Sequence, residues 1–310
     1  MKNMGVNFLQ TAAWGRFQDA IGREVIEKSG DGWSYLAIVE KGRFARRLYC
    51  PYGPTVENAK ALKAALGDLT TEARERKLDF LRIEPVGDIK FPALSKLGLV
   101  RSHHDVQPSH TVINDVSIDP EAITAGVSQS VRRYARKAEK AGVTYSVSYD
   151  PVDIRHFIDM IHDVSTRTGM KPMSDFYFSH IASALFPTHD AGLLFAELDG
   201  RKIAAIIFYN SGETMSYAHA ASYSEYRNIT PATGLGLYAL LFAHDEGCKW
   251  FDWHGIAPEN ASKSHRWAGF TQFKLSFGGQ RVERLGTWEL PVRKMRYRLY
   301  KIVLKIAGKD

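Results

Sequence analysis

The sequence contains few cysteines and no long hydrophobic run. Only Cys50 and Cys248 occur among the 310 residues, and neither stands in a metal-ligand spacing. Two cysteines cannot form a disulfide framework, so they indicate a reducing compartment. The longest apolar stretch, 234–243, is far shorter than the roughly 18 residues that a membrane span requires. Residues 1–18 have no continuous apolar core, and we therefore expect no signal peptide and a cytoplasmic protein.

The motifs of several common enzyme classes are also absent. The sequence has no G-x-S-x-G elbow, no P-loop and no dinucleotide-binding glycine fingerprint. The histidines are scattered, and none belongs to an H-E-x-x-H motif or a Cys/His cluster. We interpret the densest group, His103, His104 and His110, as a surface loop. These absences argue against a serine hydrolase, a P-loop enzyme and a metal site.

What is present is typical of a folded globular protein. Hydrophobic residues make up 45% of the chain and charged residues 24%, and no linker is rich in Pro, Gly or Ser. This length and composition can bury two medium-sized cores, so we expect two domains. The net charge of +7 favours an acidic partner, such as nucleic acid, an anionic membrane face or a phosphorylated substrate. A merely basic surface is the alternative.

Hydrophobic periodicity and turn signals predict a mixed α/β fold. Residues 128–141 form the clearest expected helix, with Ser128 as N-cap and Gly142 as C-terminal stop. Two apolar runs, 193–198 and 203–209, indicate a hairpin. Further helices are expected at 17–21, 57–77, 153–166 and 235–246, and further strands at 35–39, 47–49, 80–83, 143–149, 214–220 and 250–253. In the second half, helices alternate with strands as in a mixed α/β sheet.

A glycine-rich turn precedes the expected helix at 235–246. Residues 231–236 (PATGLG) resemble the turn of GNAT acyltransferases, in which backbone N–H groups and the helix dipole hold the pyrophosphate of coenzyme A. The first position here is Pro231, which has no N–H to donate and therefore argues against coenzyme A binding. The alternative is that the glycines only allow close packing at the helix start.

Short motifs in a fixed order run along nearly the whole chain. They are 8–18 (FLQTAAWGRFQ), 49–54 (YCPYGP), 80–85 (FLRIEP), 111–116 (TVINDV), 132–143 (RRYARKAEKAGV), 252–256 (DWHGI) and 269–279 (GFTQFKLSFGG). Together they resemble the Fem family of peptidoglycan-precursor aminoacyltransferases. Three positions depart from the family pattern: Ser130 replaces a lysine, and Tyr52 and Met173 replace arginines. These departures indicate that substrate recognition differs from that of the best-known members.

The resemblance implies an α/β protein with mixed sheets and two tandem GNAT-like acyltransferase domains. Domain 1 would comprise residues 1–144, completed by the C-terminal segment 285–310, and domain 2 would comprise residues 145–284. The chain is too short for the helical hairpin inserted in some members, which places it near the compact FemX-like ones. The implied activity is transfer of an amino acid from aminoacyl-tRNA to the stem peptide of lipid II or UDP-MurNAc-pentapeptide, which builds an interpeptide bridge. No cofactor is expected, because the aminoacyl-tRNA is the donor substrate.

The resemblance also implies roles for individual residues. Lys274 would stabilise charge on the ester carbonyl or the leaving ribose oxygen, and Asp115 would orient the attacking amine or take its proton. Phe273 would stack on the terminal adenosine, and Tyr177 and Tyr217 would contact the precursor. Plainer interpretations stay open: a solvated lysine at a strand end, an aspartate in a turn, and tyrosines of the core or rim.

Two basic regions suggest further contacts. Arg132 and Arg136 lie on the helix expected at 128–141 and would bind the tRNA backbone or the diphosphate of the precursor. The amphipathic segment 292–306 would make a peripheral contact with the inner face of the plasma membrane. The alternatives are a solvated basic face and a helix docked on domain 1 with its lysines outward.

Two other functions remain open at this point. One is a coenzyme A-dependent N-acyltransferase of the GNAT type, including the FemAB-like enzymes of exopolysaccharide clusters, which would bind acetyl-CoA. The other is a non-enzymatic protein that binds tRNA or a membrane surface and transfers nothing to any acceptor.

Overall fold

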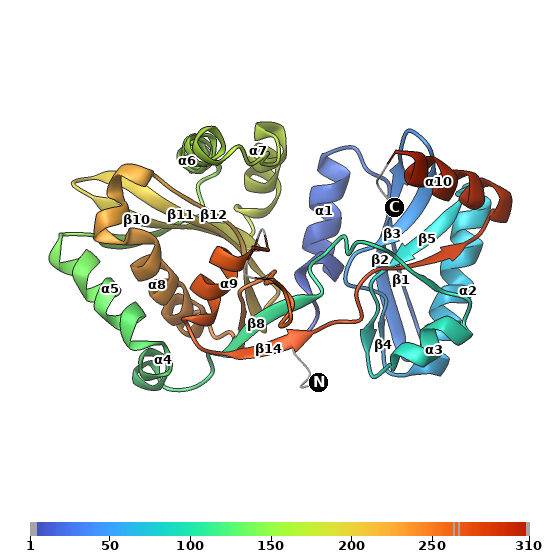
Figure 1. Ribbon diagram of the computed structural model, residues 1–310, viewed down its shortest axis with the longest axis horizontal. Coiled ribbons are helices and arrows are strands. Elements are labelled where there is room, and N and C mark those ends of the chain that lie inside the picture. The colour runs from blue at the N-terminus through green and yellow to red at the C-terminus, as the bar shows by residue number, and fades with distance from the viewer. Residues whose placement is uncertain (1–4, 263, 266, 308–310) are drawn as a thin grey trace. The chain divides into compact units, whose positions relative to one another are not determined.

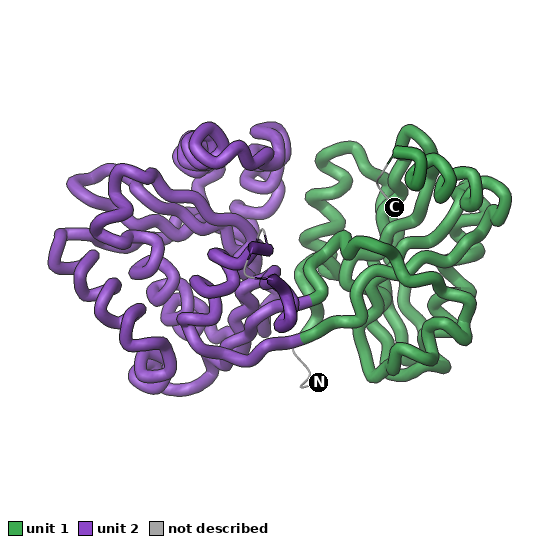
Figure 2. Tube along the Cα trace, in the orientation of Figure 1, with its two compact units in different colours: residues 1–109, 283–310 green, residues 110–282 purple. Residues whose placement is uncertain are grey.

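The computed structural model describes residues 5–262, 264–265 and 267–307, and the chain forms two compact units (Figure 2). Unit 1 comprises residues 1–109 and 283–310, and unit 2 comprises residues 110–282. The boundary predicted between residues 144 and 145 differs from this division. Residues 110–144 pack in unit 2 because their strand, His110–Asp115 (β8), pairs with Trp250–Asp252 (β13).

Unit 1 is built on one mixed sheet. Its strands are Val25–Gly30 (β1), Trp33–Lys41 (β2), Arg46–Cys50 (β3), Thr55–Val56 (β4), Phe80–Ile83 (β5), Val86–Gly87 (β6), Val100–Arg101 (β7) and Trp288–Pro291 (β15). Its helices are Phe8–Gln10 (η1, a 3-10 helix), Ala12–Ala20 (α1), Ala59–Glu75 (α2), Phe91–Lys96 (α3) and Lys294–Ile306 (α10). The strand order is β6-β4-β2-β3-β5-β15-β7, with β1 beside β2. The last strand of the chain, β15, therefore lies between two strands from the first third of the sequence.

Helices cover both faces of this sheet (Figure 1). Alternate residues of β5 point to opposite faces, as in any strand. Leu81 and Ile83 join the core that α2 and α3 bury, whereas Phe80 packs on α10. Asn58 starts α2, because its side-chain oxygen accepts hydrogen bonds from two backbone N–H groups of the first turn.

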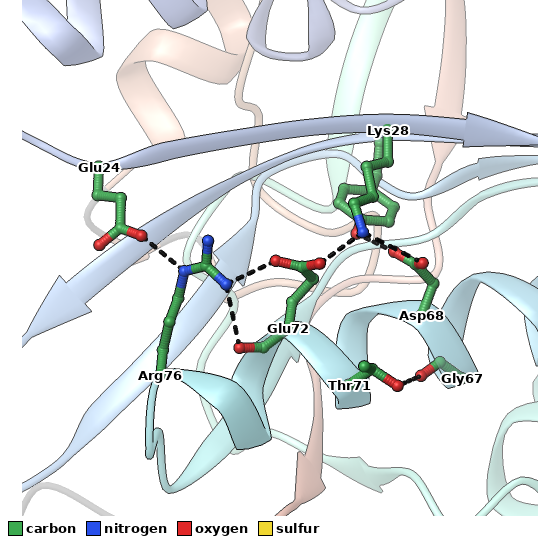
Figure 3. Close-up of polar contacts among 8 residues, drawn as sticks. Glu24, Lys28, Gly67, Asp68, Thr71, Glu72 and Arg76 are labelled. Carbon is green, nitrogen blue, oxygen red and sulfur yellow. Dashed lines mark hydrogen bonds and ion pairs between the residues drawn. The ribbon is translucent and has the colours of Figure 1, made fainter.

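A network of ion pairs joins α2 to β1 at the surface of unit 1 (Figure 3). Lys28 on β1 lies 2.5 Å from Glu72 and 3.4 Å from Asp68. Arg76 bonds the other oxygen of Glu72 and also Glu24, each at 2.6 Å. Because all of these side chains except Glu72 are at least partly exposed to solvent, their attraction is screened. We assign this network to the docking of α2 and not to function.

Unit 2 has a second mixed sheet. Its remaining strands are Thr144–Ser148 (β9), Ala191–Leu198 (β10), Arg201–Asn210 (β11), Thr214–Ser222 (β12) and Gln280–Glu283 (β14), in the order β14-β8-β13-β12-β11-β10-β9. Its helices are Pro120–Gly126 (α4), Gln129–Lys140 (α5), Ile154–Thr168 (α6), Asp175–Leu185 (α7), Pro231–Asp245 (α8) and Ala268–Leu275 (α9), with 3-10 helices at Pro151–Asp153 (η2) and Ser224–Ile229 (η3). Mixed α/β architecture with two sheets is thus confirmed.

The helices of unit 2 form two layers, with α4, α5 and α8 on one face of the sheet and α6 and α7 on the other (Figure 1). The clearest sequence predictions are confirmed here. Ser128 caps α5 by accepting the Val131 N–H at 3.3 Å, and β10 pairs with β11 as a hairpin. Helices α7 and α9 were not predicted. Among the described residues, no helix is both long and apolar enough to cross a bilayer.

The strands β12 and β13 separate within the sheet. They run parallel and pair only from Thr214 to Ser216 on β12, although β12 continues to Ser222. Just beyond the paired part, a β-bulge shifts the register of β12 against β11. In a regular strand, two residues that are two positions apart point to the same face of the sheet. Because of the bulge, Tyr217 and His219 point to opposite faces. The candidate site lies where these two strands part.

Candidate active site

The turn after β13 presents two backbone carbonyls. Asp252, the last residue of β13, is buried, and its Oδ1 accepts hydrogen bonds from Thr111 Oγ1 at 2.5 Å and from the His254 N–H at 2.7 Å. His254 has a φ of 55°, in the left-handed region that non-glycine residues rarely adopt. The Asp252 carboxylate therefore stabilises this turn, in which the carbonyls of His254 and Gly255 face Lys274.

Lys274 extends from α9 to these carbonyls. Its Nζ donates to the oxygen of His254 at 2.6 Å and to that of Gly255 at 2.8 Å. Burial lowers the pKa of Lys274 to about 8, and the nearby Asp252 carboxylate acts in the opposite direction. Because an ammonium has three N–H donors, these two bonds leave one for a ligand. Lys274 thus lies in a helix and is partly buried, in contrast to the solvated strand-end lysine of the plainer interpretation.

Aromatic side chains surround this ammonium. Its nitrogen lies 5.5 Å from the centroid of the Tyr217 ring, within the range of cation–π attraction. Trp253, fully buried, lies 5.3 Å from Tyr217 and 6.2 Å from Phe273, centroid to centroid. Tyr217 and Phe273 are only half-buried. The structure therefore brings together three of the residues predicted from the sequence: Lys274, Tyr217 and Phe273.

His219, which the sequence analysis did not select, follows the bulge of β12. Aromatic rings from α6 and α7 enclose it, with Phe178 at 5.2 Å and Tyr177 at 6.1 Å between centroids. Burial, and secondly the neighbouring His254, lower the pKa of His219 to about 4. The imidazole is therefore neutral at pH 7. Tyr177 lies against this histidine, on the α7 side of the sheet.

Asp115 lies at the other end of β13 from the Lys274 contacts. It stands opposite Trp250, whereas Lys274 bonds the carbonyl of His254, four residues further along. The Asp115 carboxylate accepts from the N–H and Oγ of Ser117 at 3.1 and 2.6 Å, as in a turn. The acidic group that acts on Lys274 is Asp252, which was not predicted.

Arg132 and Arg136 lie on α5, which packs on α8 away from β13. Arg132 donates to the carbonyl of Ala125 at 2.9 Å and also to that of Val127. It thus holds the connection between α4 and α5 while remaining half-exposed. Arg136 is exposed on the outer side of the helix. The structure does not bring these arginines to the Lys274 site.

The glycine-rich start of α8 is closely packed. The N-cap residue Thr230 has a φ of 54°, and its carbonyl accepts two backbone N–H groups of the first turn at 3.1 and 3.4 Å. A Cβ at Gly234 would lie 1.8 Å from the hydroxyl oxygen of Tyr145, and one at Gly236 would lie 2.5 Å from the ring of Phe277. Both glycines serve packing, and this turn has few N–H groups left for an anion.

We predict that Gly234→Ala destabilises unit 2 by about 1–3 kcal/mol, because its methyl group would have to displace Tyr145. The Tyr145 hydroxyl is buried and has no hydrogen-bond partner among the described residues, so Tyr145→Phe in the same chain should restore part of the stability. Urea unfolding measures both effects. Gly67→Ala in α2 is the control, since its Cβ would meet nothing within 4 Å. Strictly additive effects of the two substitutions would contradict this contact.

Three features of the site escaped the sequence analysis: Asp252, the strained His254 and the neutral His219. Asp252 and His254 lay inside a recognised motif, but neither was selected. The left-handed backbone conformation of His254 could not be predicted, because glycine is the residue that usually indicates it in a sequence. In the described part of the chain, no three His, Cys, Asp or Glu side chains gather as a metal ion would need.

The sequence and the fold were compared with those of known proteins. Residues 199–305 match the model of the FemAB family, a segment that includes Tyr217, the turn after β13 and Lys274. No curated protein matches the sequence. Among solved structures, the crystal structure of FemX is similar, with a TM-score of 0.84, 18% identity and 94% of each chain covered.

Two further structures share the fold. The C-terminal domain of a protein designated a lysylphosphatidylglycerol synthetase, from Agrobacterium fabrum, has a TM-score of 0.61 at 11% identity, over 97% of this chain and 94% of that one. A tandem GNAT protein from the clavulanic acid biosynthesis pathway has a TM-score of 0.52 at 14% identity, over 87% and 83%. The predicted architecture of two tandem GNAT-like domains is confirmed. The chain thus matches the FemAB family by sequence over residues 199–305, and it shares the fold of FemX over nearly its whole length.

Proposed function

We propose that the chain transfers an amino acid from aminoacyl-tRNA to an amine of the stem peptide of a peptidoglycan precursor, and so helps to build an interpeptide bridge. Lys274 carries the proposal: it is a partly buried ammonium, held by two carbonyls, inside the segment that matches the FemAB family. A fixed cation suits a reaction in which negative charge develops on an ester.

In the proposed step, the acceptor amine attacks the ester carbonyl and forms a C–N bond, and the ribose oxygen leaves with the electrons of the broken C–O bond. The remaining N–H of Lys274 stabilises the oxyanion or the leaving oxygen, which takes up the proton that the amine loses. Phe273 would stack on the terminal adenosine, and Tyr217 and Tyr177 would contact the precursor. No cofactor is required, because the aminoacyl ester is already an activated donor.

Two carboxylates have different parts in this proposal. Asp252 is a positioning residue, since it holds the turn whose carbonyls bind the ammonium of Lys274. The amine-orienting role expected of Asp115 would require an acceptor that extends along β8 to the start of β13.

The partners follow from the same proposal. Arg136 and the exposed basic side chains beside it on α5 would attract the tRNA backbone or the precursor diphosphate, with Arg132 in a supporting position. The acceptor would be either UDP-MurNAc-pentapeptide or lipid II. The segment 292–306 would contact the inner face of the plasma membrane, where a lipid-linked acceptor lies.

Coenzyme A-dependent acyl transfer is the rival reaction, and the similarity to a tandem GNAT protein favours it. The geometry of α8 weighs against it. A pyrophosphate would need backbone N–H groups at the first turn, where the chain has a proline and where Thr230 already accepts two N–H groups.

The experiment is a transfer assay with bulk tRNA charged with radiolabelled amino acids and with either acceptor. Label that moves to one acceptor would identify both substrates. Saturable acetyl-CoA binding with no transfer from any charged tRNA would replace the proposal with the rival reaction. Binding of tRNA or vesicles without transfer to any acceptor would indicate a non-enzymatic protein.

We predict that the single-turnover transfer rate falls as the pH rises through about 8, the pKa to which burial lowers Lys274. The sign follows from the charge: the ammonium is present below this pKa and is lost above it. Any activity that Lys274→Arg retains should lack this descending limb, because a guanidinium keeps its proton. Spontaneous ester hydrolysis is subtracted with a protein-free control. If the rate of the arginine variant falls above pH 8 as the wild-type rate does, a group other than Lys274 causes the fall.

A further inference from the structure

The C-terminal helix α10 docks on unit 1 by one face only. Tyr297 and Tyr300 are buried, and their rings lie 5.3 and 5.1 Å from that of Phe80 on β5, centroid to centroid. The hydroxyl of Tyr297 donates to the buried Glu289 of β15 at 2.8 Å. These contacts fix the rotation of the helix about its axis, and with it the direction of the opposite face.

That opposite face is apolar and exposed. Met295, Leu299, Ile302 and Ile306 follow one another at intervals of four, three and four residues, so they form one line along the helix. Their exposed fractions are 70%, 59%, 54% and 82%. We refer to these four residues as the apolar stripe. A stripe of this kind normally faces a protein core, whereas here the core-facing side is already occupied by the two tyrosines.

Positive charges flank the apolar stripe. The helix carries Lys294, Arg296, Arg298, Lys301 and Lys305, and the segment 292–306 contains no acidic residue. Four of the five cations lie on one side of the stripe at 100° per residue, and Arg296 lies on the other. A surface that covers the stripe must therefore accept both apolar side chains and several cations.

One more exposed apolar side chain belongs to a turn next to α10. Phe44, in the turn between β2 and β3, is 56% exposed, and the guanidinium carbon of Arg43 lies 5.3 Å from the centroid of its ring. The next residue, Ala45, packs in the same small cluster as Phe80, Tyr297 and Tyr300. The turn thus lies next to α10 in unit 1, and it adds an exposed aromatic ring and a cation to this part of the surface.

We propose that this surface docks on an anionic lipid bilayer. The apolar stripe and Phe44 would enter the boundary between headgroups and acyl chains, and the flanking cations would lie at the level of the lipid phosphates. A second copy of the chain is a poorer occupant, because a paired α10 would bring cations against cations. A nucleic acid would pair with the cations and leave the stripe in water.

This docking does not depend on the transfer reaction, but it deepens the proposed function, because a bilayer-bound enzyme would meet a lipid-linked acceptor. Lipid II would then be the favoured acceptor over UDP-MurNAc-pentapeptide.

Co-sedimentation with vesicles tests the proposal. The intact protein should bind vesicles that contain phosphatidylglycerol, with less binding at high salt, and should not bind vesicles of phosphatidylcholine alone. The double variant Leu299→Ser, Ile302→Ser should lower the partition coefficient by about tenfold or more, and Phe44→Ser by several-fold. The matched control is Val152→Ser with Met173→Ser, since these side chains of unit 2 are 59% and 47% exposed. The control should bind as the wild type does.

Two results would overturn the proposal. One is unchanged vesicle binding by the stripe variant, with circular dichroism showing that all variants are folded. The other is a dimer in sedimentation velocity without lipid that the stripe variant dissociates. The rate with soluble UDP-MurNAc-pentapeptide separates this proposal from the transfer reaction: stripe variants should keep it while they lose vesicle binding. Absence of transfer with every acceptor would reject the proposed function and leave the docking result standing.

Discussion

Lys274→Ala should lower the rate of aminoacyl transfer by about 100- to 1,000-fold, the usual effect of removing one donor that stabilises a developing oxyanion. The expectation rests on the position of the ammonium. Two backbone carbonyls hold it at 2.6 and 2.8 Å, so its remaining N–H has a fixed direction at the transition state. A mobile surface lysine would have to be ordered during the reaction and would contribute less.

Single-turnover rates with one charged tRNA and one acceptor measure this effect. Lys249→Ala is the matched control, since this lysine is also in unit 2 and forms an exposed ion pair with Glu213. The control should transfer at the wild-type rate. Transfer by Lys274→Ala within a few-fold of wild type would remove Lys274 from the mechanism. The substitution leaves two carbonyls without their donor, so urea unfolding must accompany the rates, to separate lost chemistry from lost folding.

The second large effect concerns stability, and we expect Glu289→Ala to destabilise unit 1 by about 3–5 kcal/mol. Glu289 is 2% exposed on β15, and one of its oxygens accepts from Arg82 Nε at 3.0 Å and from Arg82 Nη2 at 2.5 Å. Its other oxygen accepts from Tyr297 of α10. Removing the Glu289 carboxylate leaves the nearly buried guanidinium of Arg82 without its partner. It also removes the hydrogen bond by which Tyr297 of α10 binds β15.

Chemical unfolding of the whole chain measures this change. Glu213→Ala breaks the exposed pair with Lys249 and serves as the control, with an expected loss below about 1 kcal/mol. Replacing Arg82 and Glu289 together by leucines should cost less than Glu289→Ala alone, because no charge is left unpaired. A loss below 1 kcal/mol for Glu289→Ala would contradict the importance of this pair. Weaker vesicle binding by the same variant would further connect α10 to the bilayer.

Elements with strong local signals were predictable from the sequence. The helix at 128–141 was expected from its cap and its apolar spacing, and α5 begins after Ser128 as predicted. The strand at 80–83 matches β5, and the two runs around Asp199 form the hairpin of β10 and β11. The helix and the hairpin depend on interactions within a few residues, such as a capping oxygen or a tight turn. The motif order likewise indicated a resemblance to the Fem family without tertiary information, and residues 199–305 match the FemAB family model.

Long-range pairing was not accessible in the same way. The sequence placed the domain boundary after residue 144, whereas β8 joins the second sheet by pairing with β13, more than a hundred residues away. The bulge in β12 sends Tyr217 and His219 to opposite faces, and an alternating pattern cannot reveal where one extra residue is inserted.

In the candidate site, too, some features were predictable from the sequence and others depend on the tertiary structure. Residue types and motifs by themselves selected Lys274, Phe273 and Tyr217 as candidate site residues and predicted a fold of two GNAT-like domains. Only the tertiary structure decided that Lys274 binds two carbonyls from a turn twenty residues earlier, that Asp252 holds this turn, and that Asp115 lies at the far end of β13. The physical reason is that a hydrogen bond between distant residues depends on the position of every strand between them, whereas a helix cap or a hairpin turn is settled by its nearest neighbours in the chain.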